Sequence, residues 1–459
     1  MRIGMRIKYA GLLILVVFFF ILAVQKAEAA NAAKFTPSIQ VDYNWNDNIM
    51  SVDVNKFDPI TMQWLDYLVG IDFSYKTKAT KTSVTGHIGY SQYISASANY
   101  KQQFPGTGLQ KYDYTNMDLT GDFQYFSKGL SIDLTDTIKH SRNFSDIFGG
   151  QENNFSNYYL YTDNLASVQV GYKTKTPLST LVRYENQTTV FDNPPIAQSR
   201  TMPNSYANTI YLKPVYAVNP RMNVGLDIQG GQRIYSDVHY YVSGIKYDMK
   251  ISDYNFAQAM AEVTYRLSTK ANLIADAGVY YRDFFDQDVA VQKIKGYTIP
   301  VGKIGFNQSV TNKYTINFDA IYSTNTYGMN LYFTYWQLDG DFKYYIAKPL
   351  YVDLGLIYKQ DYYNRDKLDM ARVWAHDRID NVFLGMATVN WDILRKREVP
   401  YLTLLVEYQY QLNDSNMNSP EDFLAQRTAV MGTATSYSTK VDSISAQIKF
   451  SPTIFFGPR

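Results

Sequence analysis

The sequence predicts an all-β protein, a closed antiparallel transmembrane β-barrel of about 18 strands with short periplasmic turns and long extracellular loops. Three observations predict this fold. Apolar and polar residues alternate along many segments of strand length, the connections between these segments are alternately short and long, and aromatic residues stand near the ends of the apolar faces.

The alternation is clear in the segment Leu350 to Tyr363. One face carries the apolar residues Leu350, Val352, Leu354, Leu356 and Tyr358. The other face includes Asp353 and Lys359. Successive residues of a strand point to opposite faces, so the two faces meet different surroundings. A soluble sandwich and a membrane barrel both fit one such strand.

The connections alternate in length along the chain. Short breaker segments occur at Thr77 to Thr80, Ser127 to Gly129, Lys175 to Pro177, Asn219-Pro220, Ser268 to Ala271, Asn312-Lys313, Ala347 to Pro349 and Arg395 to Pro400. Longer polar segments lie between them, at Gln102 to Gln110, Arg142 to Asn157, Asp192 to Ser205, Asp237 to Lys250, Asp286 to Lys295, Asn364 to Asp380 and Asn413 to Thr435. Outer-membrane barrels have short connections at one end and long connections at the other. Soluble sandwiches do not divide their connections by length in this way. An even number of strands puts both termini of the barrel at the periplasmic end. We also expect irregular strands near Tyr240 and Tyr327.

Aromatic residues mark the ends of the apolar faces. Examples are Tyr172, Tyr265, Tyr322, Tyr358, Tyr408 and Trp391. Amphipathic rings belong at the level of the lipid head groups. We therefore expect Leu350 to Leu356 to face hydrocarbon, and Asp353 and Lys359 to face a wet interior.

The N-terminus has the pattern of a secretory signal peptide. Arg2, Arg6 and Lys8 precede an apolar run from Tyr9 to Val24, and Ala27-Glu28-Ala29 supplies small residues for cleavage. The alternative is a retained anchor, for which the run is short. The predicted organisation is a cleaved signal peptide over residues 1–29 and a single barrel over residues 30–459.

The composition of the mature chain excludes some classes of protein. The whole chain holds 42 Tyr and 25 Phe but no Cys, so disulfides do not stabilise it. Removal of the signal peptide leaves 40 basic and 41 acidic residues. A nearly neutral chain argues against nucleic-acid binding, which needs a basic surface.

The polar faces of the predicted strands supply the candidate functional residues. The residues expected to face the lumen are Asp72, Asp122, Asp133, Arg183, Asp227, Arg266, Asp276, Asp319, Asp341, Lys343, Asp353 and Glu407. Burying so many charged side chains without water would cost roughly several kcal/mol for each charge. A barrel of this size is wide enough for an aqueous channel. The alternative is that these charges pair and stabilise the wall.

The sequence offers little support for catalysis. His140 and Ser141 are adjacent, so in a strand they point to opposite faces and cannot work together as base and nucleophile. Metal-ligand spacings and phosphate-binding glycine loops are lacking, so no metal and no cofactor is expected. We expect that the protein is not an enzyme.

The first mature strand, FTPSIQVDYNWNDNIM, resembles the opening of the β-barrel porin type 2 family. The matching residues are Pro37-Ser38-Ile39 and Asn46-Asp47-Asn48-Ile49. The alternative reading of the Asn-Asp-Asn motif is a turn, because both residue types tolerate left-handed backbone. The resemblance implies an outer-membrane barrel encoded in exopolysaccharide loci, and a conduit for a secreted polysaccharide. The C-terminus departs from the ending usual in such barrels, because Gly457-Pro458-Arg459 follow the last aromatic residues.

Two of the long connections have helical features. In one, Ser419 and Pro420 suit the start of a helix that runs to Val430, and the other spans Arg365 to Arg378. Either helix could fold into the lumen or rest on the rim of the barrel.

Three functions follow from the predicted fold. The first is a channel that exports a polysaccharide or another solute, the second is a general diffusion porin for small solutes, and the third is a non-conducting structural or adhesive barrel. The expected location is the outer membrane of a Gram-negative bacterium. The expected partners are outer-membrane lipid and lipopolysaccharide, the barrel-assembly machinery and, by the resemblance, periplasmic components of polysaccharide export.

Overall fold

The computed structural model describes the strands and most of the short turns of the chain. The described residues are 33–47, 61–98, 108–141, 160–192, 204–236, 238–242, 245–249, 253–285, 296–309, 313–327, 331–364, 376–396, 399–416, 439–452 and 454–456. The predicted signal peptide and the two predicted loop helices lie outside these residues, apart from His376 to Arg378, and stay predictions. Among the described residues, no helix is both long and apolar enough to cross a membrane.

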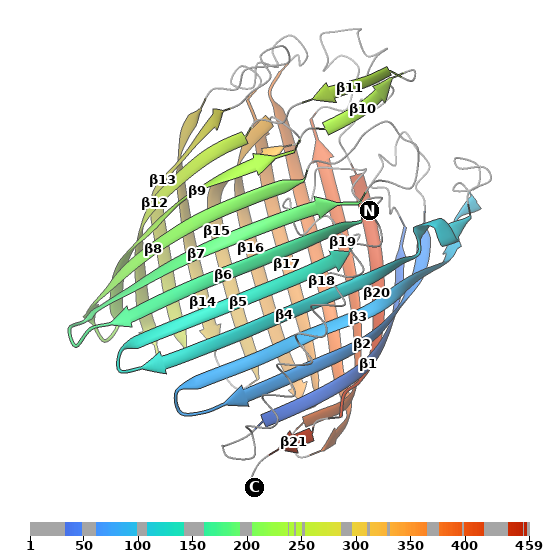
Figure 1. Cartoon of the computed structure of the whole chain (residues 1–459), viewed down its shortest axis with the longest axis horizontal. Coiled ribbons are helices and arrows are strands. Elements are labelled where there is room, and N and C mark those ends of the chain that lie inside the picture. Colours follow the sequence, from blue (N-terminus) through green and yellow to red (C-terminus); the bar gives the residue numbers. More distant parts are fainter. Residues whose placement is uncertain are drawn as a thin grey trace.

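Eighteen long strands form one antiparallel sheet that winds into a cylinder (Figure 1). They are β1 (Ala33–Asn46), β2 (Met62–Lys76), β3 (Thr80–Ala96), β4 (Tyr114–Ser127), β5 (Leu130–Ser141), β6 (Tyr161–Lys173), β7 (Leu178–Phe191), β8 (Ser205–Asn219), β9 (Met222–Tyr235), β12 (Asp253–Ser268), β13 (Ala271–Phe285), β14 (Tyr297–Ser309), β15 (Tyr314–Tyr327), β16 (Leu331–Ala347), β17 (Leu350–Tyr363), β18 (Arg378–Lys396), β19 (Val399–Ser415) and β20 (Thr439–Phe450). The predicted fold class and strand number are confirmed for the described part of the chain.

The last strand closes the barrel against the first. β20 pairs with β1 from Ile39↔Phe450 to Asn46↔Ser443. Beyond Pro452, the short β21 (Ile454–Phe456) continues this seam and pairs with the start of β1. Proline cannot donate to the ladder, which accounts for the break between β20 and β21. Every strand of the cylinder therefore has two hydrogen-bonded neighbours.

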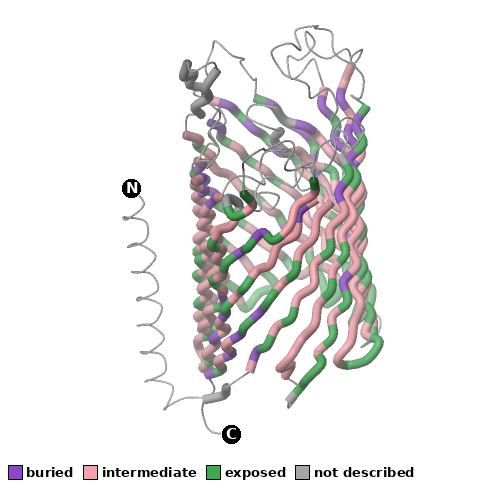
Figure 2. The backbone as a smooth tube through the Cα atoms, turned by 90° about the vertical axis from the view of Figure 1, so that its right-hand side faces the viewer, coloured by how far each residue is buried: buried purple, intermediate pink, exposed green. Residues whose placement is uncertain are grey.

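The two faces of the wall differ as predicted. On β17, Leu354 is 45% and Leu356 is 50% exposed on the outer face. Lys359 lies on the inner face as predicted, but it is buried in an ion pair with Asp361 and does not face water. The same alternation is clear on β8, β12 and β13, and Figure 2 shows exposed residues recurring along the strands. The apolar face lies on the outside of the cylinder and the polar face lines its interior. Asp136 breaks the pattern on the outer face, where it accepts a hydrogen bond of 2.7 Å from Asn164 Nδ2.

The short turns fall where the sequence predicts them. The connection from β4 to β5 consists of Lys128 and Gly129, and Gly129 has φ +88°. A Cβ on Gly129 would lie 2.5 Å from the Lys173 carbonyl oxygen, so glycine suits both the conformation and the space. Both termini of the barrel lie at the end that carries these short turns.

The long connections differ from the prediction in four places. A long connection that the sequence analysis did not include, residues 47–61, joins β1 to β2. The segment expected to be the loop Asp237 to Lys250 contains a separate hairpin of β10 (Val238–Val242) and β11 (Ile245–Met249), as the irregularity near Tyr240 suggests. Only residues 328–330 join β15 to β16, near the expected irregularity at Tyr327.

The fourth difference concerns residues assigned to loops that belong to strands. Arg378 to Asp380 begin β18, and Asn413 to Ser415 end β19. Polar residues made these segments resemble loops. A transmembrane strand needs only about 9–11 residues to cross the bilayer, so strands of this length extend beyond it and carry polar side chains there.

We expect Leu354→Arg to destabilise the barrel by about 2–4 kcal/mol, because it puts a cation on the lipid-facing wall. Asp353→Asn is the matched control, since its carboxylate lies inside, 3.7 Å from Lys343 Nζ in a partly exposed pair. Such a pair contributes at most about 1 kcal/mol. Urea unfolding midpoints of the two variants refolded in lipid give the comparison. Equal losses would show that the two residues do not face different solvents.

The alternation of short and long connections predicts which end of the barrel faces the periplasm. A Cys at Gly108, in the long connection before β4, should react with an impermeant maleimide on intact cells, because the site is exposed and open. A Cys at Lys175, in the short turn between β6 and β7, should react only after the outer membrane is permeabilised. The opposite pattern would invert the predicted topology.

Candidate functional site

The inner wall of the barrel is the candidate site, and its charged side chains come from nearly all the strands. The strand register puts every predicted lumen-facing residue on the inward face, because register partners share a face. These residues are Asp72 on β2, Asp122 on β4, Asp133 on β5, Arg183 on β7, Asp227 on β9, Arg266 on β12, Asp276 on β13, Asp319 on β15, Asp341 and Lys343 on β16, Asp353 on β17 and Glu407 on β19.

Several of these residues form ion pairs along the wall. Lys303 Nζ lies 2.8 Å from Asp319 Oδ2, and Lys343 lies 3.7 Å from Asp353. Arg183 lies 3.5 Å from Glu185. The side chains of Lys303 and Asp319 keep 35% and 32% of their surface exposed, so space remains beside them inside the cylinder. The interior at this level is therefore not a packed dry core.

One ion pair joins strands that are not neighbours. Lys213 on β8 contacts Glu262 on β12, across β9. Gly225 is the register partner of Glu262 on β9, and it has no side chain to separate the two groups. The concave curvature of the inner wall brings the next-but-one strands within reach. The alternation of the sequence shows which face Lys213 occupies, but it does not reveal this partner.

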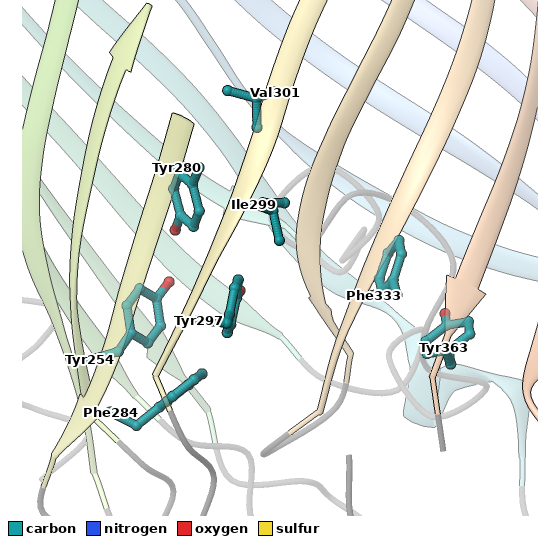
Figure 3. Close-up of a cluster of buried hydrophobic side chains, with 8 residues drawn as sticks. All are labelled: Tyr254, Tyr280, Phe284, Tyr297, Ile299, Val301, Phe333 and Tyr363. Atoms are coloured by element: carbon teal, nitrogen blue, oxygen red, sulfur yellow. The ribbon is translucent and has the colours of Figure 1, made fainter. Parts of the chain in front are cut away.

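A second group of inward side chains lies toward the end of the barrel that carries the long connections. We call it the aromatic tier: Tyr254, Tyr280, Phe284, Tyr297, Phe333 and Tyr363, all buried. Figure 3 shows these rings along the inner side of neighbouring strands, together with Ile299 and Val301. The sequence pattern does not reveal the tier, because inward aromatic residues look like the ends of lipid-facing stripes.

Two buried ion pairs lie against rings of the aromatic tier. Lys359 lies 2.9 Å from Asp361, and its Nζ lies 4.7 Å from the ring centre of Phe333. Arg378 pairs with Asp380 and lies 4.5 Å from the ring centre of Tyr363. Each cation thus has a carboxylate and an aromatic face as partners.

A pair of carboxylates lies on the wall opposite β13, one of the strands that carry the aromatic tier. Asp42 on β1 and Asp66 on β2 are register partners, so two carboxylates stand side by side. Gln40 donates to Asp42 and Asn44 donates to Asp66, each at 2.8 Å. β2 is the second strand of the ring and β13 is the eleventh, so they lie nine places apart in a ring of eighteen. The carboxylates of β1 and β2 therefore face the tyrosines and Arg282 of β12 and β13 across the lumen.

The structure places His140 and Ser141 on opposite faces of β5. His140 lies on the outer face, where its Nδ1 is 2.9 Å from Thr162 Oγ1, and Ser141 is on the inner face, as expected for adjacent strand residues. In the described part of the chain, no three His, Cys, Asp or Glu side chains gather in a way that could hold a metal ion.

A large hollow of about 560 Å³ lies on the outer wall rather than in the lumen. Phe318, Leu354 and Tyr408 line it, and Gly340 leaves space there. Nearly all of its lining is apolar, so it is a hollow for lipid. An apolar exterior around a closed polar interior requires a bilayer on the outside and water within. The chain is a β-barrel of the Gram-negative outer membrane.

Comparison with known proteins finds likenesses among solved structures only. No protein-family model matches the chain, and no curated protein sequence matches it. It is similar to OccAB2 of Acinetobacter baumannii, with 8% identity, 92% of this chain and 98% of that chain covered, and a TM-score of 0.46. It is also similar to a BenF-like porin of Pseudomonas fluorescens Pf-5 (10% identity, 92% and 99% covered, TM-score 0.45) and to Pseudomonas aeruginosa OpdK with vanillate (9% identity, 92% and 99% covered, TM-score 0.43).

The buried pair of the aromatic tier predicts a stability effect. We expect Arg378→Met to cost about 3–5 kcal/mol, because it leaves Asp380 buried without its cation. Arg395→Met is the matched control, since Arg395 lies near a short turn in a partly exposed pair with Asp392, worth about 1 kcal/mol or less. Urea unfolding in lipid measures both. A loss of the same size in both variants would contradict the prediction.

Proposed function

We propose that the protein is a passive aqueous channel that lets small hydrophilic solutes diffuse across the outer membrane. The observation that carries the proposal is the exposure of the inner-wall ion pair of Lys303 and Asp319, whose side chains keep 35% and 32% of their surface free inside a closed wall. Charged groups in this setting require water around them. A continuous column of water along the lumen is a diffusion path.

The opposed walls support diffusion of small polar solutes over a purely structural role. Carboxylates at Asp42 and Asp66 face the arginine and tyrosines of β12 and β13, so a solute at this level meets charged and polar groups on both sides. Such a lining favours hydrophilic solutes over apolar ones. A barrel that served only as a scaffold or an adhesin has no need of a charged interior.

The second candidate is the polysaccharide conduit suggested by the first mature strand. The inward rings of the aromatic tier favour it, because the apolar faces of sugar rings pack on aromatic side chains. Periplasmic export components and the barrel-assembly machinery remain predicted partners. Both candidates require a water-filled lumen and differ in the size of the passenger.

Reconstitution in planar bilayers tests the channel. Purified barrel should give stepwise conductance increases that grow in proportion to the salt concentration, as expected for a water-filled pore. Absence of conductance from protein that is folded, judged by heat-modifiable migration in gels, would favour a non-conducting barrel.

Liposome swelling with sugars of increasing length separates the two candidates. A diffusion channel should admit monosaccharides and exclude long oligosaccharides, whereas a polysaccharide conduit should admit both. Liposomes that lack the protein are the control.

A further inference from the structure

The wall of the barrel is incompletely paired between β14 and β15. Their register pairs begin at Ser309↔Thr315, beside the short turn, and end at Gly302↔Tyr322. Above that point, residues 297–301 of β14 and 323–327 of β15 would continue the register but form no pair. Among the described strands, no other seam leaves five residues unpaired on both of its edges. We call these two unpaired edges the seam gap.

Both strands stay regular along the seam gap, so only the seam between them is interrupted. β14 pairs with β13 as far as Arg282↔Tyr297, and β15 pairs with β16 as far as Tyr327↔Leu331. Pro300 lies within the unpaired edge of β14. Proline has no N–H to donate to a ladder and is confined to edge strands and bulges. It also hinders the addition of a further strand to this edge, which argues against an extended peptide as the occupant.

The seam gap begins at the level of the lipid head groups. Tyr322 and Trp336 are register partners on the outer wall, 41% and 37% exposed, at the point where the pairing of β14 with β15 ends. Tyrosine and tryptophan rings mark the membrane interface. Unpaired backbone groups are costly in hydrocarbon, but at the interface water and head groups can bond to them. In the predicted orientation, the seam gap therefore faces the head groups of the outer leaflet.

Side chains, rather than backbone hydrogen bonds, close the wall at the seam gap. Tyr297, Ile299 and Val301 lie on the inner side of β14, are 8%, 7% and 6% exposed, and pack with the aromatic tier (Figure 3). The Tyr297 side chain interacts with Thr324 of β15, and Thr324 Oγ1 donates to the Phe333 carbonyl oxygen at 2.8 Å. The tyrosine thus links the two edges where the ladder is missing. It can rotate away without breaking a backbone hydrogen bond.

The surroundings of the seam gap suit an uncharged amphipathic molecule. Ile299, Val301 and Phe333 belong to one apolar cluster on the inner side. Lys359 lies 4.7 Å from the Phe333 ring centre, but it has a carboxylate of its own, Asp361, at 2.9 Å. A charged solute would lose water here without gaining a counter-ion. A molecule with an apolar ring or chain and one polar end would instead meet apolar side chains and the two hydroxyl groups of the closing contact.

We propose that the seam gap is a lateral gate, through which a neutral amphipathic molecule passes between the lumen and the outer leaflet. The aromatic tier lines the path on the lumen side, and the contact of Tyr297 with Thr324 closes it. The gate goes beyond the proposed channel, because it gives the lumen a second exit through the wall. Hydrophilic solutes still pass along the axis of the barrel.

A cross-link across the seam gap tests the gate. The chain has no native cysteine, so Val301→Cys combined with Ser323→Cys gives a single pair of thiols at positions that would continue the register. Oxidation joins the two thiols, or a bifunctional maleimide does so if the edges stand further apart. The matched control is Ile304→Cys combined with Ala320→Cys, at register partners in the paired part of the same seam.

The probe is N-phenyl-1-naphthylamine, an uncharged aromatic molecule that fluoresces when it moves from water into lipid. Its initial rate of uptake is measured on intact cells that express the barrel, and cells without the barrel give the background. We expect the cross-link between residues 301 and 323 to lower the barrel-dependent rate at least threefold, and the control cross-link to leave it unchanged. A rate that does not exceed the background, or that neither cross-link changes, would overturn the proposal.

A substitution at the closing contact tests the gate in the opposite direction. Thr324→Val removes the hydroxyl group that meets Tyr297 and should raise the uptake rate at least twofold. Thr298→Val makes the same change at an exposed position of β14 and should leave the rate unchanged. Heat-modifiable migration in gels shows that both variants are folded. Equal rates in the two variants would overturn the closing contact, and the gate with it.

Sugar uptake separates the gate from the channel. In liposome swelling with glucose, the cross-link between residues 301 and 323 should leave the rate unchanged, because glucose passes along the axis. Slower entry of glucose as well as of the probe would overturn the lateral route, since the cross-link would then obstruct the lumen itself. A barrel that admits no glucose but has a probe uptake sensitive to the cross-link would refute the channel and leave the gate standing.

Discussion

The structure depends on one constraint: within hydrocarbon, every backbone N–H and C=O must find a partner in the protein itself. The pairing of β20 with β1 meets this constraint, because it removes the two free edges of the sheet. Closure then divides the chain into an outer face for lipid and an inner face for water. The alternation of Leu354 and Asp353 on β17 follows from this division.

Curvature is the second consequence of closure. On the concave inner wall, side chains from next-but-one strands come within reach, as Lys213 and Glu262 do across β9 and as Arg233 and Gln187 do across β8. Small residues at Gly225 and Ala207 leave room for these contacts. The result is a wall with local networks, in which some cations have carboxylate partners and others have only neutral ones.

The distribution of charge around the ring bears on function. Closure puts the Asp42 and Asp66 carboxylates opposite the β12 and β13 wall, where Arg282 stands among tyrosines. A solute in the lumen meets acidic groups on one side and guanidinium and aromatic groups on the other.

The sequence by itself determined the fold, the strand number, the positions of most turns and the face on which Asp353 or Lys343 lies, because strand periodicity and turn chemistry are local properties. It misplaced Arg378 and Asp380, since polar residues of a strand beyond the bilayer look like a loop. Only the tertiary structure decided which charges are partners, that Asp66 and Arg282 lie on opposite walls, and that the pairing of β14 with β15 ends at Gly302 and Tyr322. Those relations depend on register and closure, which join residues far apart in the chain and leave no local pattern.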